Sequence, residues 1–459
     1  MLDTSPVPTV PAADITHTRR PATTGAIRSE RRAPTGAIRT HGAHPATGPI
    51  VRHPGDSLST RRRVLYVILL GALTALGPFT VDLYLPAFPV LEADFRTSAA
   101  AIQLTLTGTM IGFALGQLVV GPLSDKMGRR VPLIIVTALH VLASMAAALA
   151  PSLELLMLAR VLMGAGAAAG GVVAAAIVRD LFGGRRLVIM LSRLALVSGV
   201  APVVAPLIGS ALLTVVPWRG IFVALAIYGV VMLTCAVAFI PETLPPSRRH
   251  EQGSTTVLQR YRSVLGDRVF IGVLIIGGMT FSGLFSYLSA SSFLFQQTYG
   301  FNPQQYGLLF AINSVGVVLG VQTASRLAAR FGPQWVMAFS TAALVVAASA
   351  IVVCDALGAG IWGVMVPLFV FMTACGFTFP CAQVLALDRH GKAAGTAQSL
   401  LGAVNFGVAG LVSPLVGWIA GDAGITPTTM ASVMVGCAVI GVLALWLVVR
   451  PKTVEQLAP

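Results

Sequence analysis

The run VLYVILLGALTALGPFTVDLYLP, residues 64–86, decides the class of structure, because it is long and apolar enough to cross a lipid bilayer. It holds a single formal charge, at Asp82. A carboxylate near the middle of a bilayer costs roughly 2.5–3.5 kcal/mol on insertion scales, so its presence in such a run indicates a functional site.

The composition of the chain extends this interpretation to the whole protein. Hydrophobic residues make up 55% of the 459 residues, charged residues only 10%, and the mean hydropathy is +0.82. A soluble protein carries about 25% charged residues. We therefore expect an all-α integral membrane protein with twelve transmembrane helices near residues 64–86, 98–120, 131–150, 153–177, 188–214, 219–240, 269–292, 304–324, 334–353, 361–387, 395–420 and 428–449.

The net charge of +14 could indicate nucleic-acid binding, but the basic residues are placed for a membrane protein. They occupy every second link between predicted spans, at Arg61, Arg62, Arg63, Lys126, Arg129, Arg130, Arg179, Arg185, Arg186, Arg248, Arg249, Arg260, Arg262, Arg326, Arg330, Arg389, Lys392, Arg450 and Lys452. The other links carry Glu92, Asp94, Glu154, Asp355 and Asp422, with Arg96 and Arg219 as the few basic residues. The positive-inside rule then predicts a multi-pass protein of the cell membrane with both termini in the cytoplasm, and a lipid bilayer rather than nucleic acid as its partner.

Three polar segments divide the chain. Residues 1–60 repeat TGAIR at 24–28 and 35–39 without an apolar pattern, so we expect a disordered basic arm. Residues 241–267 form a cytoplasmic linker between a six-helix bundle over 61–240 and another over 268–450, and residues 451–459 form a tail. A weak internal repeat supports this division: GPLSDKMGRR (121–130) follows the second span, and the similar SRLAARFGPQ (325–334) follows the eighth. The repeat predicts two pseudo-symmetric bundles.

The stretch GPLSDKMGRR resembles the signature between the second and third helices of the major facilitator superfamily. The matching residues are Gly121, Asp125, Gly128, Arg129 and Arg130. Glycine can end a helix, and a carboxylate and basic residues can bind at a tight turn between helix ends. The resemblance implies a latch between the two halves that steadies an outward-facing state.

Two further stretches resemble motifs of drug-exporting members of that superfamily. LMLARVLMGAGAA (156–168) resembles the fourth-helix motif, with Arg160 as an intramembrane cation, although Met163 stands where the family often has glutamine. GVAPVVAPLIGS (199–210) resembles the fifth-helix antiporter motif and places small or bending residues on one helix face, at Gly199, Pro202, Pro206 and Gly209.

Three short strings narrow the resemblance. DLYLPAFP in the first span, PETL after the sixth and AGTAQSLLG (394–402) in the eleventh look like the bicyclomycin and chloramphenicol resistance subgroup, the Bcr/CflA type of drug:proton antiporter. The resemblance covers residues 60 to about 450. It implies alternating access in a monomer that uses the proton gradient and no cofactor. The five cysteines lack metal-ligand spacing, so no metal site is expected.

Asp82 and Arg160 are expected to lie at the same depth, each about seven residues, or roughly 10 Å, inside the outer end of its span, with the first span counted to Pro89. A carboxylate that alternates between a proton and a cation couples their binding, because each changes the affinity for the other by the same free energy. The alternative is a permanent structural ion pair.

Several aromatic and amide residues in the spans are candidate contacts for a small drug-like substrate: Tyr84, Gln103, Phe281, Phe285, Tyr287, Asn313, Gln383 and Asn405. At helical spacing, such residues also serve simply to pack helices. The sequence thus predicts a proton-coupled exporter of small amphipathic compounds such as antibiotics. A superfamily member that carries a specific metabolite or sugar, and a membrane-integral enzyme, are the alternatives.

Overall fold

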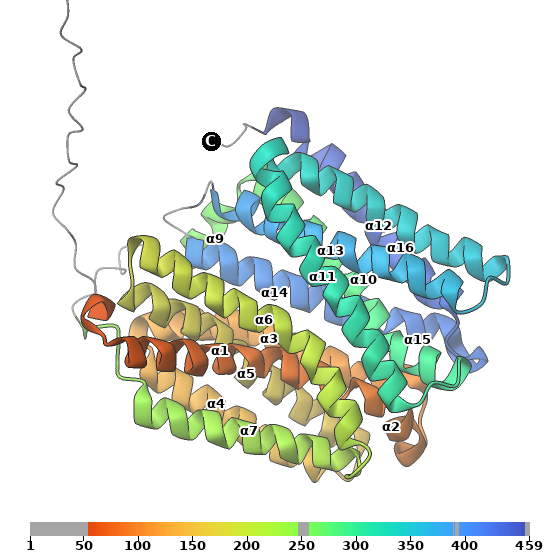
Figure 1. Cartoon of the computed structure of the whole chain (residues 1–459), viewed down its shortest axis with the longest axis horizontal. Coiled ribbons are helices and arrows are strands. Elements are labelled where there is room, and N and C mark those ends of the chain that lie inside the picture. The colour runs from red at the N-terminus through yellow and green to blue at the C-terminus, as the bar shows by residue number, and fades with distance from the viewer. Residues whose placement is uncertain (1–53, 247–256, 389, 391–393, 455–459) are drawn as a thin grey trace, which may run out of the picture. The chain divides into compact units, whose positions relative to one another are not determined.

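The computed structural model describes residues 54–246, 257–388, 390 and 394–454. Twelve helices in these ranges are long and apolar enough to cross a membrane, which confirms the predicted all-α membrane fold. Figure 1 shows them packed side by side, and helices that follow one another in the chain run in opposite directions. Predictions for residues 1–53, 247–256, 389, 391–393 and 455–459 lie outside the described residues, and with them most of the arm, parts of the linker and the tail, and the basic residues Arg248, Arg249, Arg389 and Lys392.

The first six spans come before residue 241. The first span consists of α1 (Thr60–Asp82), a short 3-10 turn η2 (Leu85–Ala87) and α2 (Phe88–Phe95). The next five spans are α3 (Ala99–Met127), α4 (Arg130–Ala148), α5 (Leu153–Leu181), α6 (Gly184–Leu212) and α7 (Trp218–Phe239).

The last six spans follow the short helix α9 (Val257–Leu265). The seventh is α10 (Arg268–Phe293) with the π-helical turn η3 (Leu294–Thr298). The eighth to tenth are α11 (Pro303–Phe331), α12 (Pro333–Ala356) and α13 (Trp362–Asp388). The eleventh is divided into α14 (Ala394–Val412) and α15 (Leu415–Ala420), and the twelfth is α16 (Pro427–Leu443), continued by a second π-helical turn, η6 (Ala444–Val449).

Several helices extend beyond the apolar runs that predict them. The sequence predicts ends at residues 120 and 324, whereas α3 reaches Met127 and α11 reaches Phe331. The polar residues after each run continue the helix until a glycine ends it, Gly128 with φ 94° and Gly332 with φ 85°. This backbone conformation is open mainly to glycine, so the helix end follows the glycine and not the end of the apolar run.

The two ends of the bundle differ in charge. At the end where α1 begins, which we call the basic end, the side chain of Arg129 bonds to Asp180, so the links after α3 and α5 meet. At the opposite end, the acidic end, the indole of Trp218 donates to Asp94 at 2.8 Å, so the links around α2 and α7 meet.

Helices from the first six spans pack against helices from the last six. α3 packs along α14, and α6 packs along α11. At the acidic end, hydrogen bonds also link the two sets: Gln296 donates to the carbonyl of Pro86 at 3.0 Å and Gln304 donates to that of Ser210 at 3.2 Å. The division into bundles at residues 241–267 stays a prediction.

Four of the five tryptophans lie exposed on the bundle near its two ends. Trp362 and Trp418 lie toward the acidic end, and Trp335 and Trp446 lie toward the basic end. Trp218 is buried. Exposed tryptophan near helix ends is typical of residues that lie at a membrane–water interface.

Candidate functional site

Asp82 is the last residue of α1, where the first span breaks. Leu83 still donates to the carbonyl of Phe79 at 3.2 Å, but Pro86 has no N–H to continue the ladder, and the chain turns into η2. Asp82 is 4% exposed. The break therefore places a buried carboxyl group at the carbonyl end of a helix.

Arg160, on α5, binds the same break. Its Nη1 donates to the carbonyl of Thr80 at 2.7 Å, near the end of α1, where a cation is favoured by the helix dipole. The guanidinium lies 3.8 Å from the ring centroid of Tyr84 and 5.7 Å from that of Phe222. These cation–π contacts hold the side chain in a fully buried position.

Asp82 and Arg160 flank the same break but make no ion pair. Among the described residues, no basic side chain lies within ion-pair distance of Asp82, and no hydrogen bond reaches its carboxyl group. Nε and Nη2 of Arg160 are buried and have no hydrogen-bond partner within the described ranges. Nε and Nη2 of Arg160 and the carboxyl group of Asp82 can thus form new hydrogen bonds or an ion pair when the conformation changes.

The predicted small face of α6 meets this break in part. A Cβ atom at Gly209 would lie 1.9 Å from the carbonyl oxygen of Leu83, so only glycine allows this close approach. Pro206 is buried, and its carbonyl lies near Gly307 of α11. Gly199 is exposed and a Cβ there would meet no atom within 4 Å, while Pro202 is half-buried.

The GPLSDKMGRR motif forms an ionic network at the basic end. Nη1 of Arg129 donates to Asp125 and, at 2.9 Å, to Ser124, and its Nε donates to Asp180 at 2.9 Å. Asp180 also accepts from Thr243 at 3.2 Å. The network connects α3, α4 and α5 with the segment after α7.

The PETL string has a structural role that the sequence did not reveal. Glu242 accepts from the backbone N–H of Arg129 at 2.8 Å and from that of Arg130 at 3.3 Å, so its carboxylate caps the start of α4. The Arg130 side chain donates to the carbonyl of Val237 on α7. Towards the last six spans, a Cβ at Gly121 would lie 3.3 Å from Oγ of Ser399 on α14.

Four of the candidate substrate contacts form hydrogen bonds with other groups of the protein. Tyr84 is fully buried, and its hydroxyl lies 3.1 Å from Oγ1 of Thr105. Gln103 is fully buried and bonds to two backbone groups. Nδ2 of Asn313 donates to the hydroxyl of Tyr287 at 3.2 Å, and both residues are buried.

The other candidates lie in an aromatic cluster or beside a pocket. The ring centroids of Phe281 and Phe285 on α10 are 6.0 Å apart, and Phe281 also contacts Phe379 on α13 and Phe406 on α14. Phe406 stacks at 4.9 Å on Phe113 of α3, so the cluster joins both sets of helices. The sequence did not single out Phe113, Phe379 or Phe406, because a phenylalanine in an apolar run carries no distinguishing signal.

Asn405 is the neighbour of Phe406 and is 9% exposed. Its Oδ1 is buried and has no hydrogen-bond partner in the described part of the chain. A buried amide oxygen without a donor is costly, so a ligand that supplies an N–H or O–H is favoured there.

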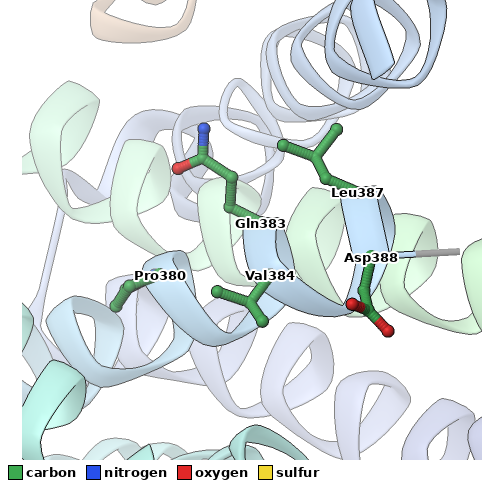
Figure 2. Close-up of a pocket in the computed structure, with 5 residues that line it drawn as sticks. All are labelled: Pro380, Gln383, Val384, Leu387 and Asp388. Atoms are coloured by element: carbon green, nitrogen blue, oxygen red, sulfur yellow. The ribbon is translucent and has the colours of Figure 1, made fainter. Parts of the chain in front are cut away.

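A pocket of 410 Å³ lies along the last turns of α13, toward the basic end (Figure 2). Its walls combine apolar and polar side chains: Pro380, Gln383, Val384, Leu387 and Asp388. Gln383 is exposed, and its Nε2 donates to Gln398 on α14 at 3.1 Å. Three apolar and two polar side chains of α13 thus line the pocket, and ligand sites also combine apolar surface with polar groups.

Twelve spans, broken helices and ionisable side chains buried at a break define a polytopic membrane protein of the secondary-transporter class. The chain belongs to the Major Facilitator Superfamily, whose family model matches residues 68–414 and 290–459.

Similar proteins of known sequence cover most of the chain. It is 35% identical over 389 residues to the uncharacterized MFS-type transporter YdgK of Bacillus subtilis, an alignment that covers 84% of this chain and 95% of that one. It is 28% identical to the bicyclomycin resistance protein homolog of Haemophilus influenzae, with 83% and 95% covered. It is 27% identical to the multidrug resistance protein MdtL of Escherichia coli O157:H7, with 85% and 98% covered.

Solved structures share the fold. The xylose transporter XylE of Escherichia coli, in a partially occluded inward-open conformation, matches with a TM-score of 0.66 at 12% identity, covering 86% of this chain and 99% of that one. A bacterial homolog of the human lysosomal transporter Spinster, inward-facing and unoccupied, matches with a TM-score of 0.65 at 15% identity, covering 88% and 100%.

Proposed function

We propose that this protein is a proton-coupled exporter of small amphipathic compounds such as antibiotics, working by alternating access in the cell membrane. The observation that carries the proposal is the pair of buried, unpaired groups at the break in the first span, the carboxyl group of Asp82 and the free donors of Arg160. Similarity to a bicyclomycin resistance protein homolog and to the multidrug resistance protein MdtL supports the export of drugs.

The chemistry of coupling follows from the cost of burying charge. An ionised carboxylate without a partner is expensive in a protein interior, so the burial of Asp82 in this conformation disfavours its charged form. Loss of the proton creates an anion at the same break as a guanidinium with two free donors, and a movement that brings the two side chains together then forms an ion pair. Binding of a proton and formation of the pair exclude each other, which lets the proton gradient favour one conformation over the other.

Substrate is taken up from the basic end, which we assign to the cytoplasm by the positive-inside rule. The pocket along α13 and the cluster around Phe281 and Phe406 offer apolar surface, and Gln383 and Asn405 offer hydrogen bonds. Such a surface binds drug-like molecules with few directional contacts. The proton gradient is the energy source, no cofactor takes part, and a monomer contains the whole site.

Reconstituted vesicles test the proposal. The purified protein in liposomes should accumulate ethidium or chloramphenicol against a concentration gradient when a proton gradient is imposed, and should stop when nigericin collapses that gradient. Growth of a pump-deficient host on a panel of antibiotics, with and without the protein, extends the test to other compounds. Export that is indifferent to the proton gradient would contradict coupling, and no export of any compound in the panel would contradict the substrate class.

A further inference from the structure

The eleventh span is broken between α14 and α15, at Ser413 and Pro414. The carbonyl of Gly410 would accept a helical hydrogen bond from residue 414, but a proline has no N–H to donate. Backbone groups freed in this way inside a membrane must find other partners, because lipid offers none.

Two side chains of α3 supply these partners from the first six spans. The hydroxyl of Thr107 donates to the carbonyl of Gly410 at 2.8 Å. The amide oxygen of Gln103 accepts from the N–H of Gly417 on α15 at 3.1 Å, and its Nε2 donates to the carbonyl of Ser289 on α10 at 3.3 Å. Gln103 is fully buried and Thr107 is 8% exposed, so these bonds are shielded from competing polar groups.

Close contact between the two helices makes these bonds possible. A Cβ at Gly410 would lie 2.8 Å from Cβ of Met110, and one at Gly417 would lie 2.8 Å from Cα of Ala100. Short side chains on α3 can therefore reach the main chain of α14 and α15. Met110, Thr107, Gln103 and Ala100 follow one face of α3 from its middle toward the acidic end.

We propose that Gln103 and Thr107 form a lock that holds the acidic end closed by binding the broken backbone of the eleventh span, and that the lock opens in each transport cycle. The proposal rests on alternating access as proposed above, since only a gate that opens requires these bonds to break. It assigns Gln103 to gating and not to contact with the substrate. Opening replaces the three bonds with bonds to water, so the lock stabilises the closed state without making it permanent.

Hydrogen exchange of the full chain in lipid nanodiscs, without drug or proton gradient, tests the lock. Thr107→Val and Gln103→Met should each increase the exchange rate of peptides covering residues 413–420 by about twofold to tenfold, the factor that corresponds to one net hydrogen bond. The double variant should exchange faster than either. Thr109→Val is the matched control, because Thr109 is also buried on α3 but its hydroxyl bonds only to the carbonyl of Thr105 in its own helix.

Unchanged exchange in Thr107→Val and Gln103→Met would overturn the lock, and so would an equal increase in Thr109→Val. If Gln103→Met fails to fold, Thr107→Val decides alone, because valine keeps the shape of threonine. The measurement involves neither drug nor protons, so its outcome is independent of whether the proposed export activity is found.

Discussion

At the scale of single residues, the sequence could identify Asp82 and Arg160 because charges within apolar runs are rare. It could not predict that the two groups make no ion pair. Whether they touch depends on the break after Asp82 and on the stacking of the Arg160 guanidinium on Tyr84, and both are set by neighbouring helices. Two residues that lie at the same depth in the membrane therefore need not contact each other.

The first residue-scale prediction concerns Asp82→Asn, which keeps the shape of the side chain and removes its proton. Accumulation of ethidium against a gradient should fall by about tenfold or more, the scale of a coupling free energy, while equilibrium binding of ethidium changes little. Proteoliposome transport and fluorescence titration of the same preparation measure the two quantities.

The control for this prediction is the double variant Asp82→Asn with Arg160→Gln, which removes both charged groups. If Asp82→Asn is poorly folded and the double variant regains abundance without coupled transport, the carboxyl group acts in coupling. Concentrative, proton-dependent export by folded Asp82→Asn would instead show that coupling depends on another group.

At the scale of helices, apolar runs predict where the spans lie but not where the helices end or break. The ends at Gly128 and Gly332 depend on glycine after a polar extension, and the breaks at Pro86 and Pro414 depend on which neighbours can bind the freed backbone groups. A proline in an apolar run is visible in the sequence, but donors such as Thr107 lie 303 residues away in the chain. No local pattern indicates such a pairing.

The ionic network at the basic end gives an element-scale prediction. Asp180→Asn should lower the free energy of unfolding by about 1.5–3 kcal/mol, because it removes a charged partner of the buried Arg129 guanidinium. Asp125→Asn should cost less, about 0–1 kcal/mol, because the Asp125 side chain is 39% exposed and solvent screens its charge.

Equilibrium denaturation of the two variants in the same detergent measures this order of stability. Because the network connects α3, α4 and α5, Asp125→Asn should also change the rate of transport more than the affinity for substrate. A larger loss of stability in Asp125→Asn than in Asp180→Asn would contradict the assignment of Asp180 as the main partner of Arg129.

At the scale of the whole molecule, the alternation of charge between links predicts orientation. Reporter fusions after Arg130, Arg186 and Pro246 should give cytoplasmic signals, and fusions near Glu154 and Asp355 should give external ones, because basic links are retained in the cytoplasm. An alkaline phosphatase and fluorescent-protein pair at each site measures both outcomes. A cytoplasmic signal at Glu154 or Asp355 would contradict the proposed orientation.

The exposed tryptophans, which fluoresce, are distributed unevenly over the molecule. All four lie in the last six spans, near both ends, whereas Trp218, the only tryptophan before residue 268, is buried. Tryptophan at the headgroup layers resists vertical displacement, so these four side chains help to fix the last six spans at one depth in the bilayer. Intrinsic fluorescence quenched by brominated lipid therefore reports mainly on the last six spans and little on the spans before residue 241.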